Sequence, residues 1–185
     1  MKFYCIFDTN VLIAYFLNNN KNSPIYKLLY DNFIKKNNII PIINKNILNE
    51  YLNVLKRGKF DNKINRSEAI SFIGILNNKS ISVENVKDYV TLLDKDRKEA
   101  LKDPKDFIFY NIVVEAKEQI NQNDTYLITG NKKHFPIKYF IKSPQEMLNY
   151  INEVEEKIEM YTSIFYHVRE DAIKKINIKN KDIER

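Results

Sequence analysis

The sequence contains one cysteine and two histidines among its 185 residues. A single cysteine cannot form an intrachain disulfide, and Cys5 with two distant histidines cannot build a zinc site. A reducing cytoplasm is therefore the expected compartment. No apolar run approaches the roughly 20 residues that a membrane-spanning helix requires. The apolar residues 3–7 are too few for the core of a signal peptide, so we expect no membrane association.

Internal repeats and Gly/Ser-rich linkers are also lacking. The length suits one domain, and a hydrophobic content of 44% is high enough for a globular core. We predict one compact domain over residues 1–150. Residues 151–185 are predicted to form a helical extension with a polar tail.

The net charge is +6 and the isoelectric point is about 9.1. A basic balance favours anionic partners, with nucleic acid first among them. The same excess of basic residues can follow from codon bias toward Lys, Asn and Ile. The charge therefore supports a nucleic-acid partner without identifying one.

Apolar runs rich in β-formers alternate with helical periodicity along the chain. Strands are predicted at 3–7, 39–43, 80–83, 125–128 and 139–141. Helices are predicted at 9–17, 24–36, 44–57, 67–76, 88–101, 107–120 and from 144 onward. Strands that alternate with helices imply an α/β fold, in which right-handed crossovers connect a parallel sheet.

Four polar residues stand at the ends of these elements and are predicted to face the same way: Asp8, Glu50, Asp106 and Asn131. Each has an ordinary structural explanation. Asp8 could cap its helix, and Asp106 could face the positive end of a helix dipole. Glu50 could pair with a lysine of its own helix, and Asn131 could be a turn residue in the left-handed region.

Taken together, these four side chains indicate one shared site and not four separate local roles. Two carboxylates about 4 Å apart repel each other by about 4 kcal/mol at an effective dielectric constant of 20. Converging acids therefore need a cation or raised pKa values. Hard oxygen ligands without thiolates suit Mg²⁺ or Mn²⁺, and such an ion can lower the pKa of water and bind a phosphate oxygen. This is the chemistry of phosphodiester hydrolysis.

Four segments around these residues resemble the motifs of the PIN domain nucleases. They are residues 7–12 (FDTNVL), 47–55 (ILNEYLNVL), 102–108 (KDPKDFI) and 127–135 (LITGNKKHF). Their order, spacing and structural context agree with that family over residues 1–150. Within the family, the sequence is most similar to the VapC-like toxins of toxin–antitoxin modules.

The resemblance implies a three-layer α/β/α sandwich with a mostly parallel sheet, here followed by a long C-terminal helix. It also implies a Mg²⁺- or Mn²⁺-dependent endoribonuclease that hydrolyses RNA through a water activated by the metal. The implied partners are the RNA substrate, a cognate antitoxin and a second copy of the chain.

The resemblance also implies roles for individual residues. Asp8 and Asp106 would be the main metal ligands. Glu50 would bind the metal through water or would orient the attacking water, and Asn131 would occupy the fourth acidic position of the catalytic set. Three further residues would join the loops by hydrogen bonds: Thr9, Asn10 and Thr129.

Asn131 carries no charge where related sequences have Asp or Asn, which weakens a second metal site and leaves one-metal and two-metal mechanisms open. Lys132 and Lys133 are predicted at the rim of the site as contacts to RNA phosphates, the alternative being a solvated basic face. A structural or surface role is predicted for His134, and Arg57 is expected further away. The aromatic residues mostly follow core periodicity, so no base-stacking platform is predicted.

Beyond residue 146, apolar residues alternate steps of four and three. They are Met147, Ile151, Val154, Ile158, Tyr161, Phe165, Val168 and Ala172. This spacing predicts an a/d stripe along one long helix. The stripe could pack along its own domain, or it could contact another subunit or an antitoxin.

Two other functional classes compete with the nuclease. One is a PIN-like module that binds RNA or protein without catalysis, which Asn131 and the apolar stripe favour. The other is a phosphatase with Asp8 as the nucleophile. Such enzymes usually carry a second acid two residues later, where this chain has Asn10.

Overall fold

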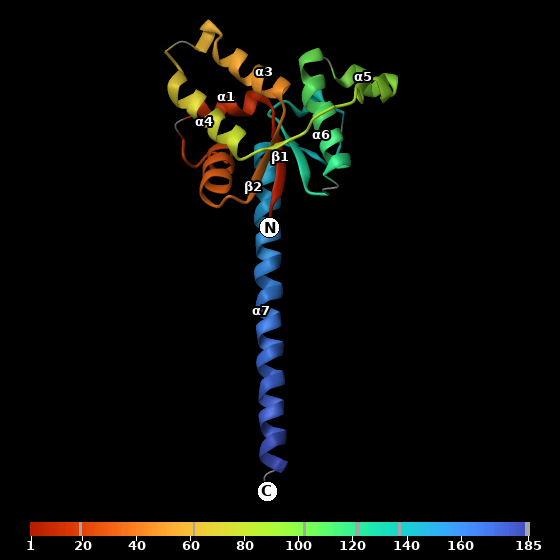
Figure 1. Cartoon of the computed structure of the whole chain (residues 1–185). Helices are drawn as coiled ribbons and strands as arrows, with labels where there is room; N and C mark the ends of the chain where they lie inside the picture. Colours follow the sequence, from red (N-terminus) through yellow and green to blue (C-terminus); the bar gives the residue numbers. More distant parts are fainter. Residues whose placement is uncertain (19, 61, 102, 121–122, 137, 184–185) are drawn as a thin grey trace. The chain divides into compact units, whose positions relative to one another are not determined.

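The structure is a computed structural model that describes residues 1–18, 20–60, 62–101, 103–120, 123–136 and 138–183. The chain forms two compact units, Met1–Leu148 and Asn149–Arg185. The first unit is an α/β/α sandwich, and a long C-terminal helix, α7 (Pro144–Ile183), continues into the second (Figure 1). The predicted fold class is thus confirmed. A functional division of the chain near residue 150 stays a prediction.

The sheet of the first unit has five strands in the order β3-β2-β1-β4-β5. They are β1 (Phe3–Phe7), β2 (Ile39–Ile43), β3 (Ile81–Ser82), β4 (Thr125–Ile128) and β5 (Ile141–Lys142). Every neighbouring pair is parallel. The longer strands are almost continuous apolar runs, because helices cover both faces of the sheet.

The central strand β1 marks a change of direction in the sheet. From β1 the chain builds outward through β2 to β3, and it then crosses to the other side of β1 to form β4 and β5. Phe7 lies opposite Ile128, so β1 and β4 end side by side. In open α/β sheets, ligands bind at such a switch point beyond the carboxyl ends of the strands.

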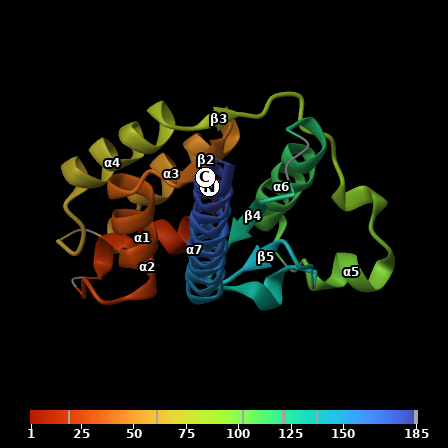
Figure 2. The ribbon, with the colours of Figure 1, turned by 90° about the horizontal axis from the view of Figure 1, so that it is seen from below.

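The helices of the first unit lie in two layers, with α1 and α2 on one side of the sheet and α6 on the other (Figure 2). The α-helices are α1 (Thr9–Leu17), α2 (Pro24–Tyr26), α3 (Lys45–Leu55), α4 (Arg66–Asn78), α5 (Lys95–Ala100) and α6 (Phe107–Gln119). A π-helix, η1 (Lys27–Lys35), continues α2. Short 3₁₀-helices are η2 (Gly58–Phe60), η3 (Val90–Leu92), η4 (Pro104–Asp106) and η5 (Lys132–His134).

Polar residues at the helix starts fix where several of these elements begin. The Asn44 side chain accepts a hydrogen bond from the Ile47 N–H, and Ser23 accepts one from Tyr26. Each bond satisfies one of the N–H groups that a helix leaves without an internal partner. The Tyr51 hydroxyl donates to the carbonyl of Phe7, which ties α3 to the end of β1.

The predicted helix over 88–101 is wrong in part, because only η3 and the short α5 form there. Side chains of α6 accept hydrogen bonds at the start of this segment. The Glu115 carboxylate accepts hydrogen bonds from the Lys87 N–H at 2.9 Å and the Tyr89 hydroxyl at 3.1 Å, and Asn111 accepts one from Val90. These bonds tie residues 87–90 to α6.

Cys5 lies fully buried at the centre of β1. Burial without a compensating charge raises the pKa of its thiol far above the usual range. Among the described residues, no helix combines the length and apolar character needed to cross a membrane.

Candidate active site

The site begins where β1 and β4 end. Asp8 follows β1 and caps α1, and its N–H donates to the Ile128 carbonyl at 2.9 Å. This bond continues the pairing of β1 and β4 by one residue. It places Asp8 beside Thr129, which lies 121 positions later in the sequence.

A set of hydrogen bonds locks the two strand ends together. The Thr129 hydroxyl donates to Asp8 Oδ2 at 2.6 Å, and the Asn10 amide donates to the same oxygen at 2.5 Å. In return, Asn10 Oδ1 accepts from the Gly130 N–H at 3.0 Å. A Cβ at Gly130 would lie 3.3 Å from that oxygen, so glycine lets the loop approach closely. The Asn131 N–H closes the set by donating to Thr129 Oγ1 at 3.0 Å.

These bonds matter because Asp8 is nearly enclosed, with 5% of its surface exposed. Burial raises the pKa of the Asp8 carboxyl, since a charge loses its hydration there. The hydrogen bonds from Thr129 and Asn10 stabilise the carboxylate and lower the pKa again in part. The Asp8 carboxyl is therefore held in a fixed orientation, in surroundings that disfavour its charged form.

Asp106 reaches the same place from the junction of η4 and α6. Burial, followed by the charges of Asp8 and Asp103, raises the pKa of Asp106 to about 6, while His134 lowers it. His134 Nδ1 lies 3.3 Å from Asp106 Oδ2, although the angles are not those of a hydrogen bond. Within the described part of the chain, this buried oxygen has no hydrogen-bond donor.

Asp103 has a different role. Its side chain accepts a hydrogen bond from the Lys105 N–H at 3.0 Å and so caps η4, and Pro104 takes the first position of that helix. The charge of Asp103 nevertheless contributes to the raised pKa of Asp106.

Glu50 faces the site from α3 and pairs with an arginine. Its carboxylate lies 3.6 Å from the guanidinium of Arg57, with both side chains partly exposed. Arg57 lies two residues beyond the end of α3 and seven residues after Glu50, which corresponds to about two helical turns. The expectation that Arg57 lies far from the site is therefore wrong.

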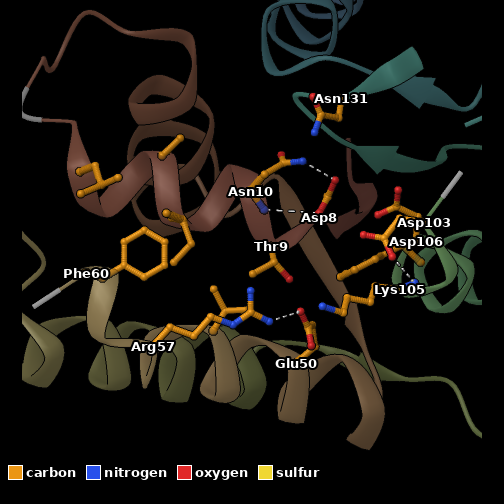
Figure 3. A pocket seen from close by; sticks show the side chains of 15 residues that line it. Asp8, Thr9, Asn10, Glu50, Arg57, Phe60, Asp103, Lys105, Asp106 and Asn131 are labelled. Carbon is orange, nitrogen blue, oxygen red and sulfur yellow. Dashed lines mark hydrogen bonds and ion pairs between the residues drawn. The ribbon is translucent and has the colours of Figure 1, made fainter. Parts of the chain in front are cut away.

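These side chains surround one cavity of about 470 Å³ (Figure 3). Asp8, Asp103 and Asp106 lie toward one end, and Phe60 lies at the other. Glu50 on α3 and Arg57 in the link between α3 and η2 also line the cavity. The remaining lining residues are Thr9, Asn10, Ile13, Ala14, Leu17, Val54, Lys105, Phe109 and Asn131.

A family model described as "PIN domain" matches residues 4–133, well over half of the chain. This chain belongs to the PIN domain family. PIN domains are in general nucleases that use divalent metal ions. The resemblance noted in the sequence motifs is therefore confirmed at the level of the family.

A solved structure, VapBC2 from Rickettsia felis bound to a DNA fragment from their promoter, is also similar to this PIN domain. The match has 15% sequence identity and a TM-score of 0.45, and it covers 76% of this chain and 98% of the other. A likeness of that degree bears on neither substrate nor partner. No functionally curated protein matches the sequence.

Some residues assigned to the site from the sequence line the cavity of this PIN domain and others do not. Asn131 lines it with a φ of −116°, which is not the left-handed turn conformation. Thr9 lines it too, but its hydroxyl is buried with no hydrogen-bond partner among the residues that the structure describes. Lys132 instead binds Glu146 at 2.7 Å, and neither Lys132 nor Lys133 lines the cavity.

The residues of this PIN domain suit a divalent cation held by few protein ligands. In the described ranges, no three side chains of His, Cys, Asp or Glu lie close enough together to hold a metal. Glu50 therefore does not form one cluster with Asp8 and Asp106. Those two carboxylates, with raised pKa values and an oxygen that lacks a donor, fit Mg²⁺, which usually keeps several waters and binds one or two carboxylates plus phosphate.

The raised pKa of Asp106 gives the first prediction, measured without metal. The unfolded carboxyl titrates near 3.8 and the folded one near 6, so the folded state binds more protons between these values. Stability from this group is present below pH 4 and is lost as the pH rises through 6. We expect Asp106→Asn to leave stability unchanged at pH 4 and to raise it by about 1–2 kcal/mol at pH 7.5, after allowance for solvent screening.

The measurement is urea unfolding in EDTA at several pH values. Asp31→Asn is the matched control, because the Asp31 carboxylate pairs with Lys35 on the exposed surface of η1. A difference between Asp106→Asn and wild type that did not grow between pH 4 and 6 would contradict the assignment.

Proposed function

We propose that this PIN domain is a Mg²⁺- or Mn²⁺-dependent endoribonuclease. One observation carries the proposal: the buried Asp8 and the half-buried Asp106 come from separate segments and line one cavity at the switch point of a parallel sheet. The excess of basic residues supports a nucleic-acid substrate. Arg57 and Lys105 are the cations that line the cavity, where they suit phosphate.

In this proposal Asp8 and Asp106 hold the cation, and Thr129 and Asn10 keep Asp8 in place. A bound Mg²⁺ or Mn²⁺ would supply a Lewis acid that lowers the pKa of water and neutralises phosphate charge. Glu50 orients the attacking water. Attack at phosphorus breaks the bond to the 3′ oxygen and leaves 3′-hydroxyl and 5′-phosphate ends. Asn131 contributes an amide in place of a fourth negative charge.

The test is cleavage of labelled single-stranded RNA by the purified chain. We expect cleavage with Mg²⁺ or Mn²⁺ and none in EDTA. DNA of the same sequence, incubated in parallel, tests the choice of RNA. Cleavage that persisted in EDTA would count against the metal, and RNA that was bound but left intact would favour the alternative.

That alternative is a PIN-like module that binds RNA or protein without catalysis. It is favoured by Asn131 and by the pairing of Glu50 with Arg57, which leaves two carboxylates at the centre of the site. Retained RNA binding without cleavage under any divalent cation would establish it.

We also propose that the protein acts in the cytoplasm as a toxin that a cognate antitoxin holds inactive. The resemblance to VapC-like toxins supports this role. The cheapest test is expression in a bacterial host, with and without a small neighbouring gene. Growth arrest that depends on Asp8 and is relieved by the neighbour is the expected result.

The exposed surface of α7 supports a protein contact, for which we propose a second copy of the chain. Large apolar side chains of the predicted stripe are exposed over residues 158–168, with exposed fractions from 45% for Ile158 to 65% for Phe165. A helix that exposes such a stripe gains little stability by itself. Two helices with the same 3.5-residue apolar repeat can pack along their stripes, and a second copy of the chain carries such a helix, which favours a homodimer.

The second prediction tests this contact. Tyr161→Glu with Phe165→Glu places two charges in the stripe, so we expect the dimer to weaken by about 100-fold or more, since unpaired buried charges cost several kcal/mol. Light scattering after size-exclusion chromatography gives the mass. Met160→Glu with Tyr166→Glu is the matched control, because these exposed residues lie outside the stripe. Equal loss in both double variants would refute the stripe as the interface.

A further inference from the structure

The cavity of the site has two ends of different chemistry. One end carries the carboxylates described above. The other is apolar, with side chains from α1, α3 and η2, and Figure 3 shows Phe60 there, away from Asp103 and Asp106. The apolar wall consists of Ile13, Ala14, Leu17, Val54 and Phe60.

The hydrolysis proposed above does not need this apolar end. A cation, its waters and one phosphate require polar partners, and those lie at the acidic end. Yet the cavity extends past Arg57 to Phe60, and its volume of about 470 Å³ falls in the range of roughly 300–1,000 Å³ that small-molecule sites occupy. Leu17, at the end of α1, keeps 43% of its surface exposed beside it. Apolar surface in a cavity favours an apolar group of a ligand.

Arg57 stands between the two ends (Figure 3). Its guanidinium is a planar cation that can bind phosphate through two hydrogen bonds. The contact with Glu50 at 3.6 Å is long, and the Arg57 side chain is 42% exposed, so a phosphate can compete for the guanidinium. From the acids to the apolar wall, the cavity thus offers a cation site, a phosphate-binding cation and an apolar pocket.

We propose that the apolar end is a nucleobase subsite, in which a base next to the scissile phosphate packs against the exposed surface of Leu17 and the edge of Phe60, which keeps 9% of its surface exposed, while Arg57 binds a phosphate. The inference rests on the proposed function and adds a subsite to it. A nucleotide matches the order of chemistries in the cavity, because it joins a flat ring with apolar faces to an anion. Every base has such a face, so the subsite accepts single-stranded or unpaired nucleotides.

The test measures binding without catalysis. The four ribonucleoside 5′-monophosphates and ribose 5-phosphate are titrated into the full chain in EDTA, and binding is followed by NMR chemical shifts. We expect the nucleotides to bind more tightly than ribose 5-phosphate. Phe60→Leu keeps an apolar side chain but removes the ring, and should weaken nucleotide binding about 5- to 150-fold, the ratio equivalent to ~1–3 kcal/mol of stacking. Binding of ribose 5-phosphate should change less than about twofold.

Leu17→Asn provides a second variant that is expected to fold, because Leu17 is partly exposed. It should also weaken nucleotide binding selectively. Leu92→Asn is its matched control, because Leu92 is 78% exposed and does not line the cavity. Equal affinities of nucleotides and ribose 5-phosphate would overturn the subsite, as would equal loss of both ligands in Phe60→Leu.

The two proposals fail in different ways. Selective nucleotide binding in EDTA without metal-dependent cleavage would support the subsite and refute the nuclease. Metal-dependent cleavage without selective nucleotide binding would support the nuclease and refute the subsite.

Discussion

Asp8→Asn and Asp106→Asn are each expected to lower RNA cleavage by about 100- to 10,000-fold. Each change removes one of the two carboxylates that would hold the cation, and a bound metal contributes several kcal/mol to such a reaction. The amide keeps the size and polarity of the side chain. The loss should appear in kcat/KM for a labelled RNA oligonucleotide, measured at saturating Mg²⁺ and again with Mn²⁺.

Asp31→Asn is the matched control for both variants, since it makes the same chemical change on an exposed surface of η1. It should retain wild-type activity. Unfolding cannot explain a loss in Asp106→Asn, because that variant is expected to be the more stable protein at neutral pH without metal. Wild-type activity in either active-site variant would refute the proposed roles of these acids.

Thr129→Val is expected to destabilise the fold by about 2–4 kcal/mol and to lower cleavage. The change keeps the shape of the side chain but removes the hydroxyl that donates to Asp8 and accepts from the Asn131 N–H. A buried polar group that loses its partner costs about 1–3 kcal/mol, and more when it is charged. The Asp8 carboxylate should consequently have a still higher pKa.

Thr125→Val is a close control for this change. Thr125 is also fully buried, at the start of the same strand, but its hydroxyl has no hydrogen-bond partner in the described part of the chain. Its replacement should be neutral or stabilising. Chemical unfolding of both variants gives the comparison, and similar free energies of unfolding for the two would show that the Thr129 bonds do not hold the site together.

Much of this site could be predicted because β1 and β4 have simple sequence signals. Buried parallel strands are apolar throughout, so the polar residue that ends each run marks the sheet edge. Asp8, directly after β1, and Asn131, three residues after β4, were placed at the sheet edge in this way. Asp106 followed from its place beside a Pro at a helix start, where Asp103 serves as the cap.

Other contacts depended on information that local patterns do not contain. The pairing of His134 with Asp106 joins segments on different elements, and periodicity within one element cannot indicate it. Lys132 was expected at the rim, but Glu146 at the start of α7 binds it. The segment over 88–101 has helical composition, yet its start is tied to α6 by Glu115 and Asn111, and only η3 and α5 form in it.

Arg57 is the exception, because a signal was present. A spacing of seven residues from Glu50 corresponds to about two helical turns. Arg57 lies two residues beyond Leu55, the last residue of α3, where a cation is also favoured by the negative helix end.

The rate at which the buried thiol of Cys5 is chemically labelled can report opening of the core around β1. A thiol-specific reagent can reach this cysteine only when the packed core around β1 opens, and the thiolate forms readily only in that open state. The labelling rate of Cys5 therefore measures how often the core opens around the strand that leads to Asp8. A ligand that binds the closed site slows labelling in proportion to its occupancy, so one unmodified side chain can report metal and nucleotide affinity without any assay of cleavage.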